Sequence, residues 1–290
     1  MSGAVLAVVR AGALTTVQDL GRPGYAHLGV PASGALDRPA HLLANRLVGN
    51  SPGAAGLETT VTGCAIRPSR PLVAAVTGAA CPVRVDGRPA AWGAPVRVPA
   101  GAVLDVGAAT CGIRSYVAFA GGLDLPPVLG SRAADLLSGL GPAPLVDGAE
   151  LPLGRARLGP AGGCDVLPYG PLGAELVLPL VPGPRADWFA PGALRALARG
   201  RYTVSPASNR IGLRTLGPPV ARVRHEELPS EGMVLGAVQV PPDGRPVVFL
   251  ADHPTTGGYP VIGVVPSPAV AAAGQAAPGA PVRFAPTSLR

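Results

Sequence analysis

The stretch VVFLADHPTTGGYPVIGVV, residues 247–265, places two short apolar runs on either side of a loop rich in turn-forming residues. Val247–Leu250 and Val261–Val265 have the length and β-branched content of buried strands. PPDG at residues 241–244 separates the first run from another apolar segment, MVLGAVQV, and is a strong turn signal. Short strands joined by dense turns predict a mostly β fold.

The rest of the chain follows the same pattern. Six short β-rich runs occur within residues 57–117, and their spacing favours a barrel or sandwich over repeated βαβ units. Helices are expected after a predicted N-cap at Asp37, around residues 132–138, between Pro191 and Gly200, and in the alanine-rich segment after Val265. The polar face of the helix after Asp37, formed by Arg38, His41 and Asn45, is expected to be solvated.

An irregular connector at residues 142–160 suggests two lobes, residues 1–145 and 146–290, within one module. The composition supports a folded chain despite 41 glycines and 36 prolines, because 48% of the residues are hydrophobic and only 14% are charged. All 24 basic residues are arginine. Without lysine, the chain cannot carry biotin or lipoate, cannot bind pyridoxal phosphate as a Schiff base, and has no P-loop lysine.

The net charge of +7 does not indicate a nucleic-acid interface, because the arginines are scattered and aromatic residues are only 4% of the chain. The one basic cluster, Arg222, Arg224 and His225, is followed at once by Glu226 and Glu227. No apolar stretch is long enough for a membrane span, and residues 4–9 are too short for a signal peptide. The four cysteines, expected as buried small residues, lack metal-ligand spacing. We therefore expect a cytoplasmic protein that binds no metal, membrane or nucleic acid.

Polar residues gather in three loops, and the first follows the N-terminal strand. Between Thr15 and Asp37 the loop contains Gln18, Asp19, Arg22 and Tyr25, and loops of this length are often functional. Asp19 is a candidate catalytic acid or base, and Arg22 suits a carboxylate or phosphate. The alternative is an Asp19–Arg22 pair that only fastens the loop.

The other two loops lie in the second half. In the first of these, Ser208 and Arg210 are candidate binding residues, and Asn209 is a candidate to polarise a substrate carbonyl. The alternative is that all three residues only form hydrogen bonds at the end of a strand. The next strand is flanked by Glu231 and Gln239. Glu231 is a candidate acid or base, or else a solvated turn residue. The last loop offers five candidate binding residues: Thr255, Thr256, Gly257, Gly258 and Tyr259. Asp252 and His253 precede them and face opposite sides unless the strand bends at Pro254.

Seven motifs in order resemble one family over nearly the whole chain. They are VQDLGRPGYAHLGVPASGALD, LANRLVGN, FAGGLDLPPVLGSR, PGPRADWF, VSPASNRIGLR, SEGMVLGAVQVPPDG and TTGGYP. The chain thus resembles the biotin-dependent carboxyltransferase-like family, also called the allophanate hydrolase subunit 2 family. That family includes the 5-oxoprolinase C subunit, antagonists of a sporulation-kinase inhibitor, and a segment of urea carboxylase. His253 and Pro254 depart from the arginine and glutamine that members often carry.

The resemblance implies a fold of cyclophilin-like β-barrel lobes. It also implies that the protein acts in a complex with other chains. In the 5-oxoprolinase case these are a related-fold subunit of the B type and a LamB/YcsF-like subunit, which together hydrolyse 5-oxo-L-proline to L-glutamate at the expense of ATP. No motif in this chain marks a nucleotide site. The alternatives are a regulatory protein that antagonises a histidine-kinase inhibitor, or the carboxyltransferase component of a urea or amide carboxylase. In the latter, another chain must deliver the carboxybiotin because this one lacks lysine.

Overall fold

The computed structural model describes residues 3–155, 173–224, 226 and 228–287. These form two compact units. The first contains residues up to 22, 37–135 and 139–155, and the second contains 23–36, 136–138 and the described residues from 173 onward. The sequence placed the lobe boundary after residue 145, whereas residues 146–155 belong to the first unit and two short segments from the N-terminal half belong to the second.

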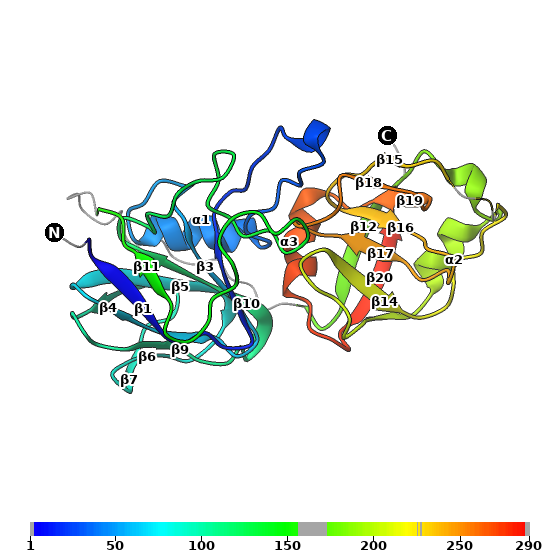
Figure 1. Cartoon of the computed structure of the whole chain (residues 1–290). Coiled ribbons are helices and arrows are strands. Elements are labelled where there is room, and N and C mark those ends of the chain that lie inside the picture. The colour runs from blue at the N-terminus through cyan, green and yellow to red at the C-terminus, as the bar shows by residue number, and fades with distance from the viewer. Residues whose placement is uncertain (1–2, 156–172, 225, 227, 288–290) are drawn as a thin grey trace. The chain divides into compact units, whose positions relative to one another are not determined.

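The first unit consists of two sheets and one helix (Figure 1). One sheet has the strand order β11-β1-β4-β9-β6-β7, and the other has the order β2-β3-β10-β5-β8. The bounds are β1 Val5–Arg10, β2 Leu14–Gln18, β3 Gly56–Thr60, β4 Cys64–Pro68, β5 Leu72–Ala80, β6 Val83–Val85, β7 Arg88–Ala90, β8 Pro95–Val98, β9 Leu104–Val106, β10 Cys111–Phe119 and β11 Glu150–Pro152. Leu6, Leu57, Ile66, Leu104 and Phe119 lie in the apolar core of this unit.

Helix α1, Arg38–Leu47, packs on β5 and β10. Its N-cap is Asp37, as the sequence predicts, because the Asp37 carboxylate accepts a hydrogen bond from the Ala40 N–H. The expectation of a solvated polar face is wrong for His41 and Asn45, which are 2% and 0% exposed. Both side chains are buried and hydrogen-bonded to each other, so the helix is held by polar contacts on its covered side.

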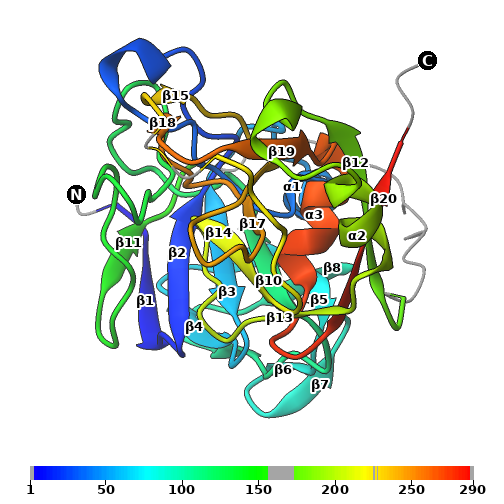
Figure 2. The ribbon, with the colours of Figure 1, turned by 90° about the vertical axis from the view of Figure 1, so that its right-hand side faces the viewer.

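The second unit contains a closed barrel with the strand order β12-β19-β16-β17-β14-β13-β20. Pairing between β12 and β20 is parallel and the other pairings are antiparallel. Helices α2 and α3 contact β20 and β12, respectively (Figures 1 and 2). The bounds are β12 Leu176–Pro182, η2 Ala186–Trp188, α2 Ala193–Arg199, β13 Tyr202–Val204, β14 Gly212–Leu216, β15 Glu231–Gly232, β16 Ala237–Gln239, β17 Val247–Phe249, β18 Thr256–Gly257, β19 Val261–Val264, α3 Ser267–Gln275 and β20 Pro281–Pro286, with η1 at Ala26–Leu28.

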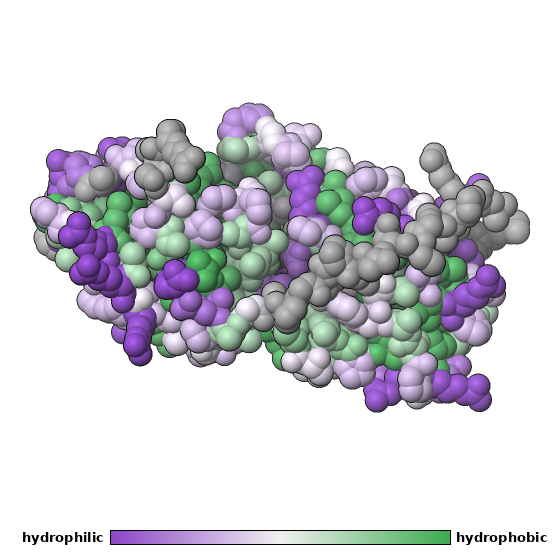
Figure 3. All heavy atoms as spheres, turned by 180° about the vertical axis from the view of Figure 1, so that it is seen from behind, coloured by the Kyte–Doolittle hydropathy of each residue, from purple (hydrophilic) through white to green (hydrophobic). Residues whose placement is uncertain are grey.

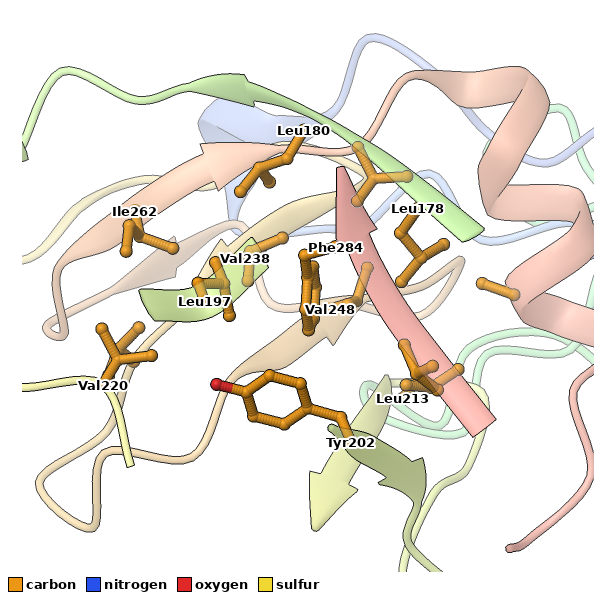
Figure 4. Packing of buried hydrophobic residues seen from close by; sticks show 14 of the residues in the cluster. Leu178, Leu180, Leu197, Tyr202, Leu213, Val220, Val238, Val248, Ile262 and Phe284 are labelled. Carbon is orange, nitrogen blue, oxygen red and sulfur yellow. The ribbon is translucent and has the colours of Figure 1, made fainter. Parts of the chain in front are cut away.

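The barrel interior is filled by aliphatic and aromatic side chains, as Figure 4 shows. Leu178, Leu180 and Phe284 are fully buried, and the Phe284 ring meets the Tyr202 ring edge to face at 5.5 Å. Burying such side chains stabilises the fold by about 1.5–3 kcal/mol each. The barrel interior is therefore a packed apolar core.

The structure confirms the mostly β fold and most of the expected turns and helices. PPDG forms the predicted turn, with the Gly244 N–H donating to the Pro241 carbonyl and Gly244 at a φ of 74°. The helix expected at residues 132–138 is absent; this segment is a loop. Its Ala133 and Ala134 carbonyls accept hydrogen bonds from side chains of the N-terminal loop, and these tertiary contacts override the helix propensity of the alanines.

Cysteine burial was expected throughout and holds for Cys64 and Cys81, but Cys111 is exposed. Cys164 lies outside the described residues. Burial raises the pKa of the Cys64 thiol to about 12. Among the described helices, none is both long and apolar enough to cross a bilayer.

Hydrophilic residues are dispersed over the surface seen in Figure 3, where they form separate groups with apolar surface between them. The guanidinium carbons of Arg222 and Arg224 lie 5.7 and 5.8 Å from the centre of the Trp188 ring, and Arg224 pairs with Asp187 at 3.1 Å. These two arginines are thus engaged with the protein; His225 and Glu227 of the same cluster are outside the described residues.

Candidate functional site

The first polar cluster forms where β2 ends. Strand β2 stops at Gln18, and the chain turns at Gly21, which has a φ of 82°. Gln18, Asp19 and Arg22 are all buried, with exposed fractions of 0%, 6% and 1%. Because these three polar side chains are buried, they need hydrogen-bond partners within the protein. Most of these partners belong to the loop of residues 128–134.

The Asp19 carboxylate organises this turn. One oxygen accepts hydrogen bonds from the Gly21 N–H at 2.8 Å and the Ser131 hydroxyl at 2.6 Å, and the other accepts from the Arg132 N–H at 2.6 Å. Three donors on one buried carboxylate make short, charge-assisted bonds. Asp19 thus fixes the loop of residues 128–134 against the end of β2.

Arg22 and Gln18 bind the same loop through its carbonyl groups. Arg22 donates to the carbonyl oxygens of Val128 and Ala133. The Gln18 Nε2 group donates to the Ala134 carbonyl at 3.0 Å. Within the described part of the chain Asp19 and Arg22 do not pair with each other, so the simple Asp19–Arg22 fastening is not what the structure contains.

A row of buried polar residues crosses the sheet beside this cluster. Thr16, Glu58, Tyr116 and Thr77 lie opposite one another on β2, β3, β10 and β5. The Tyr116 hydroxyl donates to Glu58 at 2.8 Å and accepts from the Asp37 N–H at 2.7 Å. Burial, reinforced by the Glu58 charge, raises the pKa of Tyr116 well above its usual value, so the phenol stays protonated and keeps this link.

His41 lies on the same covered side of α1. Its ring contacts the Tyr116 ring edge to face at 6.3 Å, and one ring nitrogen lies 3.0 Å from the Asn45 amide. Burial lowers the pKa of His41, although the Asp19 and Glu58 carboxylates oppose this effect. The sequence did not reveal this network, because Glu58 and Tyr116 sit in ordinary strand patterns and only the strand register aligns them.

The second cluster belongs to the barrel unit. Glu231 on β15 pairs with Gly257 on β18 and forms an ion pair with Arg185, with the Arg185 Nε 3.1 Å from a Glu231 oxygen. Gln239 at the end of β16 is 6% exposed and donates to the Tyr259 carbonyl at 3.1 Å. The structure therefore brings Glu231 and Gln239, which flank one strand in the sequence, together with the glycine loop.

The remaining loop residues complete the two-stranded β15–β18 ribbon. Thr256 pairs with Gly232, and the Thr255 carbonyl accepts from the Met233 N–H at 2.9 Å. Gly258 lies against the Leu228 carbonyl. The Tyr259 side chain is 44% exposed, so its ring and hydroxyl are presented to solvent at the end of the loop.

We expect Gly257→Ala to disturb this cluster more than Gly232→Ala. A Cβ at Gly257 would lie 2.8 Å from the Gln239 Nε2 and 3.3 Å from the Met233 side chain, whereas a Cβ at Gly232 meets nothing within 4 Å. Gly257→Ala should displace Gln239 and cost about 1–3 kcal/mol of unfolding free energy. Thermal unfolding of both variants checks this, and equal stability of the two would contradict the packing described.

The third group, residues 208–210, makes strand-end and buried contacts. The Asn209 side-chain oxygen accepts from the Ile211 and Gly212 N–H groups, and Ser208 bonds the Arg214 main chain. Asn209 is exposed. These bonds match the strand-end alternative, and the catalytic role of Asn209 stays a prediction.

Arg210 does bind an anion, and that anion is Asp252. Its Nε and Nη2 atoms each lie 2.9 Å from a different Asp252 oxygen, and both side chains are fully buried. Asp252 also accepts from the Ser33 hydroxyl at 2.6 Å and the Leu136 N–H at 3.2 Å, and Arg210 donates to the Gly34 carbonyl at 2.7 Å. The pair thereby fixes the segments 23–36 and 136–138 within the second unit.

His253 takes no part in this pair. Its ring stacks on Phe249 at 6.0 Å and one ring nitrogen lies 2.8 Å from the Pro254 carbonyl. Tyr25 belongs to the second unit, whereas Gln18, Asp19 and Arg22 belong to the first. In the described part of the chain, no three His, Cys, Asp or Glu side chains are grouped so that they could hold a metal ion.

Two β units with polar loops, one of them a closed seven-stranded barrel, match a known class of protein. A family model described as "Carboxyltransferase domain, subdomain A and B" matches residues 28–286. The chain belongs to this carboxyltransferase domain family, within the allophanate hydrolase subunit 2 group.

Among curated proteins, the 5-oxoprolinase C subunit of Escherichia coli is 37% identical over a region that covers 98% of this chain and 92% of that protein. The Haemophilus influenzae protein of the same name is 30% identical over 95% of this chain and 89% of its own length. Urea amidolyase of Lachancea kluyveri is 31% identical over 98% of this chain, but the match spans 17% of that protein.

Solved structures show the same fold. TTHA0988 superposes with a TM-score of 0.86 at 38% identity, over 98% of this chain and 56% of that one. The K. lactis urea amidolyase superposes with a TM-score of 0.88 at 29% identity, over 99% of this chain and 19% of that one. The chain thus spans only part of each of these longer proteins.

Proposed function

We propose that this chain is the C subunit of an ATP-dependent 5-oxoprolinase. The observation that carries the proposal is the 37% identity to the Escherichia coli 5-oxoprolinase C subunit over nearly the full length of both proteins. The urea amidolyase match, by contrast, covers a small part of a much longer protein. The higher identity to the 5-oxoprolinase C subunit, 37% against 31% for the urea amidolyase, favours the subunit role.

In this proposal the chain works in the cytoplasm with a related-fold B-type subunit and a LamB/YcsF-like subunit. The complex hydrolyses the lactam of 5-oxo-L-proline to L-glutamate and consumes ATP. Unpaired Cys64, Cys81 and Cys111 are in keeping with a reducing compartment. The chain has no lysine to carry biotin, lipoate or pyridoxal phosphate. As one subunit of such a complex, the chain does not act alone in this proposal.

The proposed site residues fall into two groups. Asp19 of the first unit and Asn209 and Glu231 of the second are the proposed catalytic residues. The rest bind substrate: Gln18, Arg22, Tyr25, Ser208, Arg210, Gln239, Thr255, Thr256, Gly257, Gly258 and Tyr259. The Arg210 guanidinium already binds the Asp252 carboxylate and the Gly34 carbonyl. Arg210 would therefore assist substrate binding indirectly, by holding Asp252 in place.

Reconstitution tests the proposal directly. We expect the purified chain, mixed with its B-type and LamB/YcsF-like partners, ATP and 5-oxo-L-proline, to release L-glutamate, and to release none when any one chain is left out. Glutamate is measured by chromatography and assembly by light scattering. An assembled complex without turnover would contradict the enzyme proposal and favour the regulatory alternative, in which the chain binds an inhibitor of a histidine kinase.

A second candidate is carboxyl transfer within a urea or amide carboxylase. The TM-score of 0.88 with the K. lactis urea amidolyase favours it. Since this chain has no lysine, the biotin would arrive on another protein. Transfer of labelled carboxyl from a carboxylated carrier to urea, dependent on this chain, would support this candidate over lactam hydrolysis.

A further inference from the structure

Two buried side chains of the first cluster each have one polar atom without a protein partner. Among the described residues, nothing donates to Gln18 Oε1 and nothing accepts from Arg22 Nη1. The side chains are 0% and 1% exposed. Each such atom costs about 1–3 kcal/mol, and native proteins contain few of them. An unpaired acceptor and an unpaired donor at one turn indicate a ligand with the complementary pair.

The two side chains are held by consecutive residues of one loop. Gln18 Nε2 donates to the Ala134 carbonyl, and Arg22 Nη2 donates to the carbonyl of Ala133, the preceding residue. The Gln18 amide cannot be turned over, because a carbonyl can only accept and the Ala134 oxygen requires the amide nitrogen. The free positions are therefore fixed as an acceptor at Gln18 and a donor at Arg22.

Glycine at position 141 is required for this arrangement. Gly141 has a φ of 84°, and a Cβ there would lie 2.1 Å from the Ala133 carbonyl oxygen and 3.2 Å from Arg22 Nη2. Any side chain would displace the carbonyl that orients the Arg22 guanidinium. The main chain around residues 133 and 141 is thus shaped to keep this donor in place.

We propose that Gln18 Oε1 and Arg22 Nη1 read the edge of a cis amide, accepting its N–H and donating to its carbonyl oxygen. A lactam ring holds N–H and C=O on the same side, whereas the trans form of a linear secondary amide places them on opposite sides. The inference rests on the proposed function and sharpens it: the turn recognises the ring amide itself. The Arg22 charge on the carbonyl oxygen also favours attack at the carbonyl carbon.

Lactam analogues test this on the full chain and on the assembled complex. We expect 2-pyrrolidinone and 5-oxo-L-proline to bind in calorimetry. N-methyl-2-pyrrolidinone, which lacks the N–H, and linear N-methylacetamide should bind at least about tenfold more weakly, because one buried hydrogen bond is lost. Equal binding of 2-pyrrolidinone and its N-methyl form would overturn the inference, as would absence of 2-pyrrolidinone binding to both chain and complex.

A matched pair of arginine variants separates recognition from scaffolding. Arg22 and Arg70 both donate to main-chain carbonyls, at Ala133 and at Gly154. We expect Arg22→Gln to weaken 2-pyrrolidinone binding at least about tenfold and Arg70→Gln to leave it unchanged, with folding of both checked by circular dichroism. Equal weakening would show a structural effect only. If Arg22→Gln does not fold, the analogue series on the unmodified chain decides.

The inference and the proposed function can fail separately. A complex that discriminates 2-pyrrolidinone from its N-methyl form but makes no glutamate removes the proposed function and keeps the cis-amide site. A complex that makes glutamate but binds both analogues equally removes the cis-amide site alone. A crystal soaked with 2-pyrrolidinone should show its N–H on Gln18 Oε1 and its oxygen on Arg22 Nη1; only water on these atoms would overturn the inference.

Discussion

Replacing Arg210 with methionine should lower the unfolding free energy of the second unit by about 3–5 kcal/mol, because it leaves a buried carboxylate without its countercharge. Among the described residues, Asp252 would then keep the Ser33 hydroxyl and the Leu136 N–H as donors. The Gly34 carbonyl would also lose its donor. Chemical unfolding followed by Trp188 fluorescence, in a Trp92→Phe background that removes the signal of the first unit, measures the change in the unit that contains the pair.

Arg283 provides the matched control for this prediction. The Arg283 Nε lies 2.9 Å from Glu175, the same distance as in the Arg210–Asp252 pair, but the Arg283 and Glu175 side chains are 47% and 43% exposed. Arg283→Met should cost no more than about 1 kcal/mol. If Arg210→Met and Arg283→Met lower the unfolding free energy equally, burial of the ion pair does not determine the loss of stability.

The double variant Arg210→Met with Asp252→Leu tests the mechanism of the loss. Removing both charges relieves the uncompensated carboxylate, so part of the stability should return. If the double variant is as unstable as the sum of the single changes, the loss comes from the contacts with segments 23–36 and 136–138 and not from the isolated charge.

The mostly β fold could be predicted from the sequence because strand length, β-branched content and turn residues are local signals. PPDG and the Asp37 cap are formed by residues within four positions of each other, and both are found where expected. The loop at residues 132–138 was misassigned because its alanines favour helix locally. Its actual partners, Gln18 and Arg22, are more than 100 residues away.

Some features of the candidate site could likewise be predicted from neighbouring residues, whereas others depend on residues far apart in the sequence. Gln18, Asp19 and Arg22 stand out because acid, amide and guanidinium crowd one turn. Asp252 was visible, but its partner Arg210 could not be assigned, since the pair depends on how the barrel places two loops 42 residues apart. Burial of Glu58 and Tyr116 follows from strand register, which alternation alone does not fix across three strands.

Asp19→Asn is expected to lower kcat/KM of the reconstituted complex about 100-fold or more, while the three chains still assemble. The asparagine nitrogen would face a donor, either the Gly21 N–H and Ser131 hydroxyl or the Arg132 N–H, so at least one bond becomes a repulsion. The unfolding free energy of the first unit should fall by about 2–4 kcal/mol. A displacement of the 128–134 loop by about 1 Å is enough for the expected loss of turnover.

Asp124 supplies the comparison, because it contacts the same neighbour from the surface. Its carboxylate lies 3.4 Å from the Arg132 guanidinium and is 70% exposed, so Asp124→Asn should leave both turnover and stability nearly unchanged. The shape of the kcat/KM pH profile then separates two roles for Asp19. Since three protein donors occupy its carboxylate, we expect Asp19→Asn to lower the profile without changing its shape. Loss of the acidic limb would instead identify Asp19 as the group that exchanges a proton with the substrate.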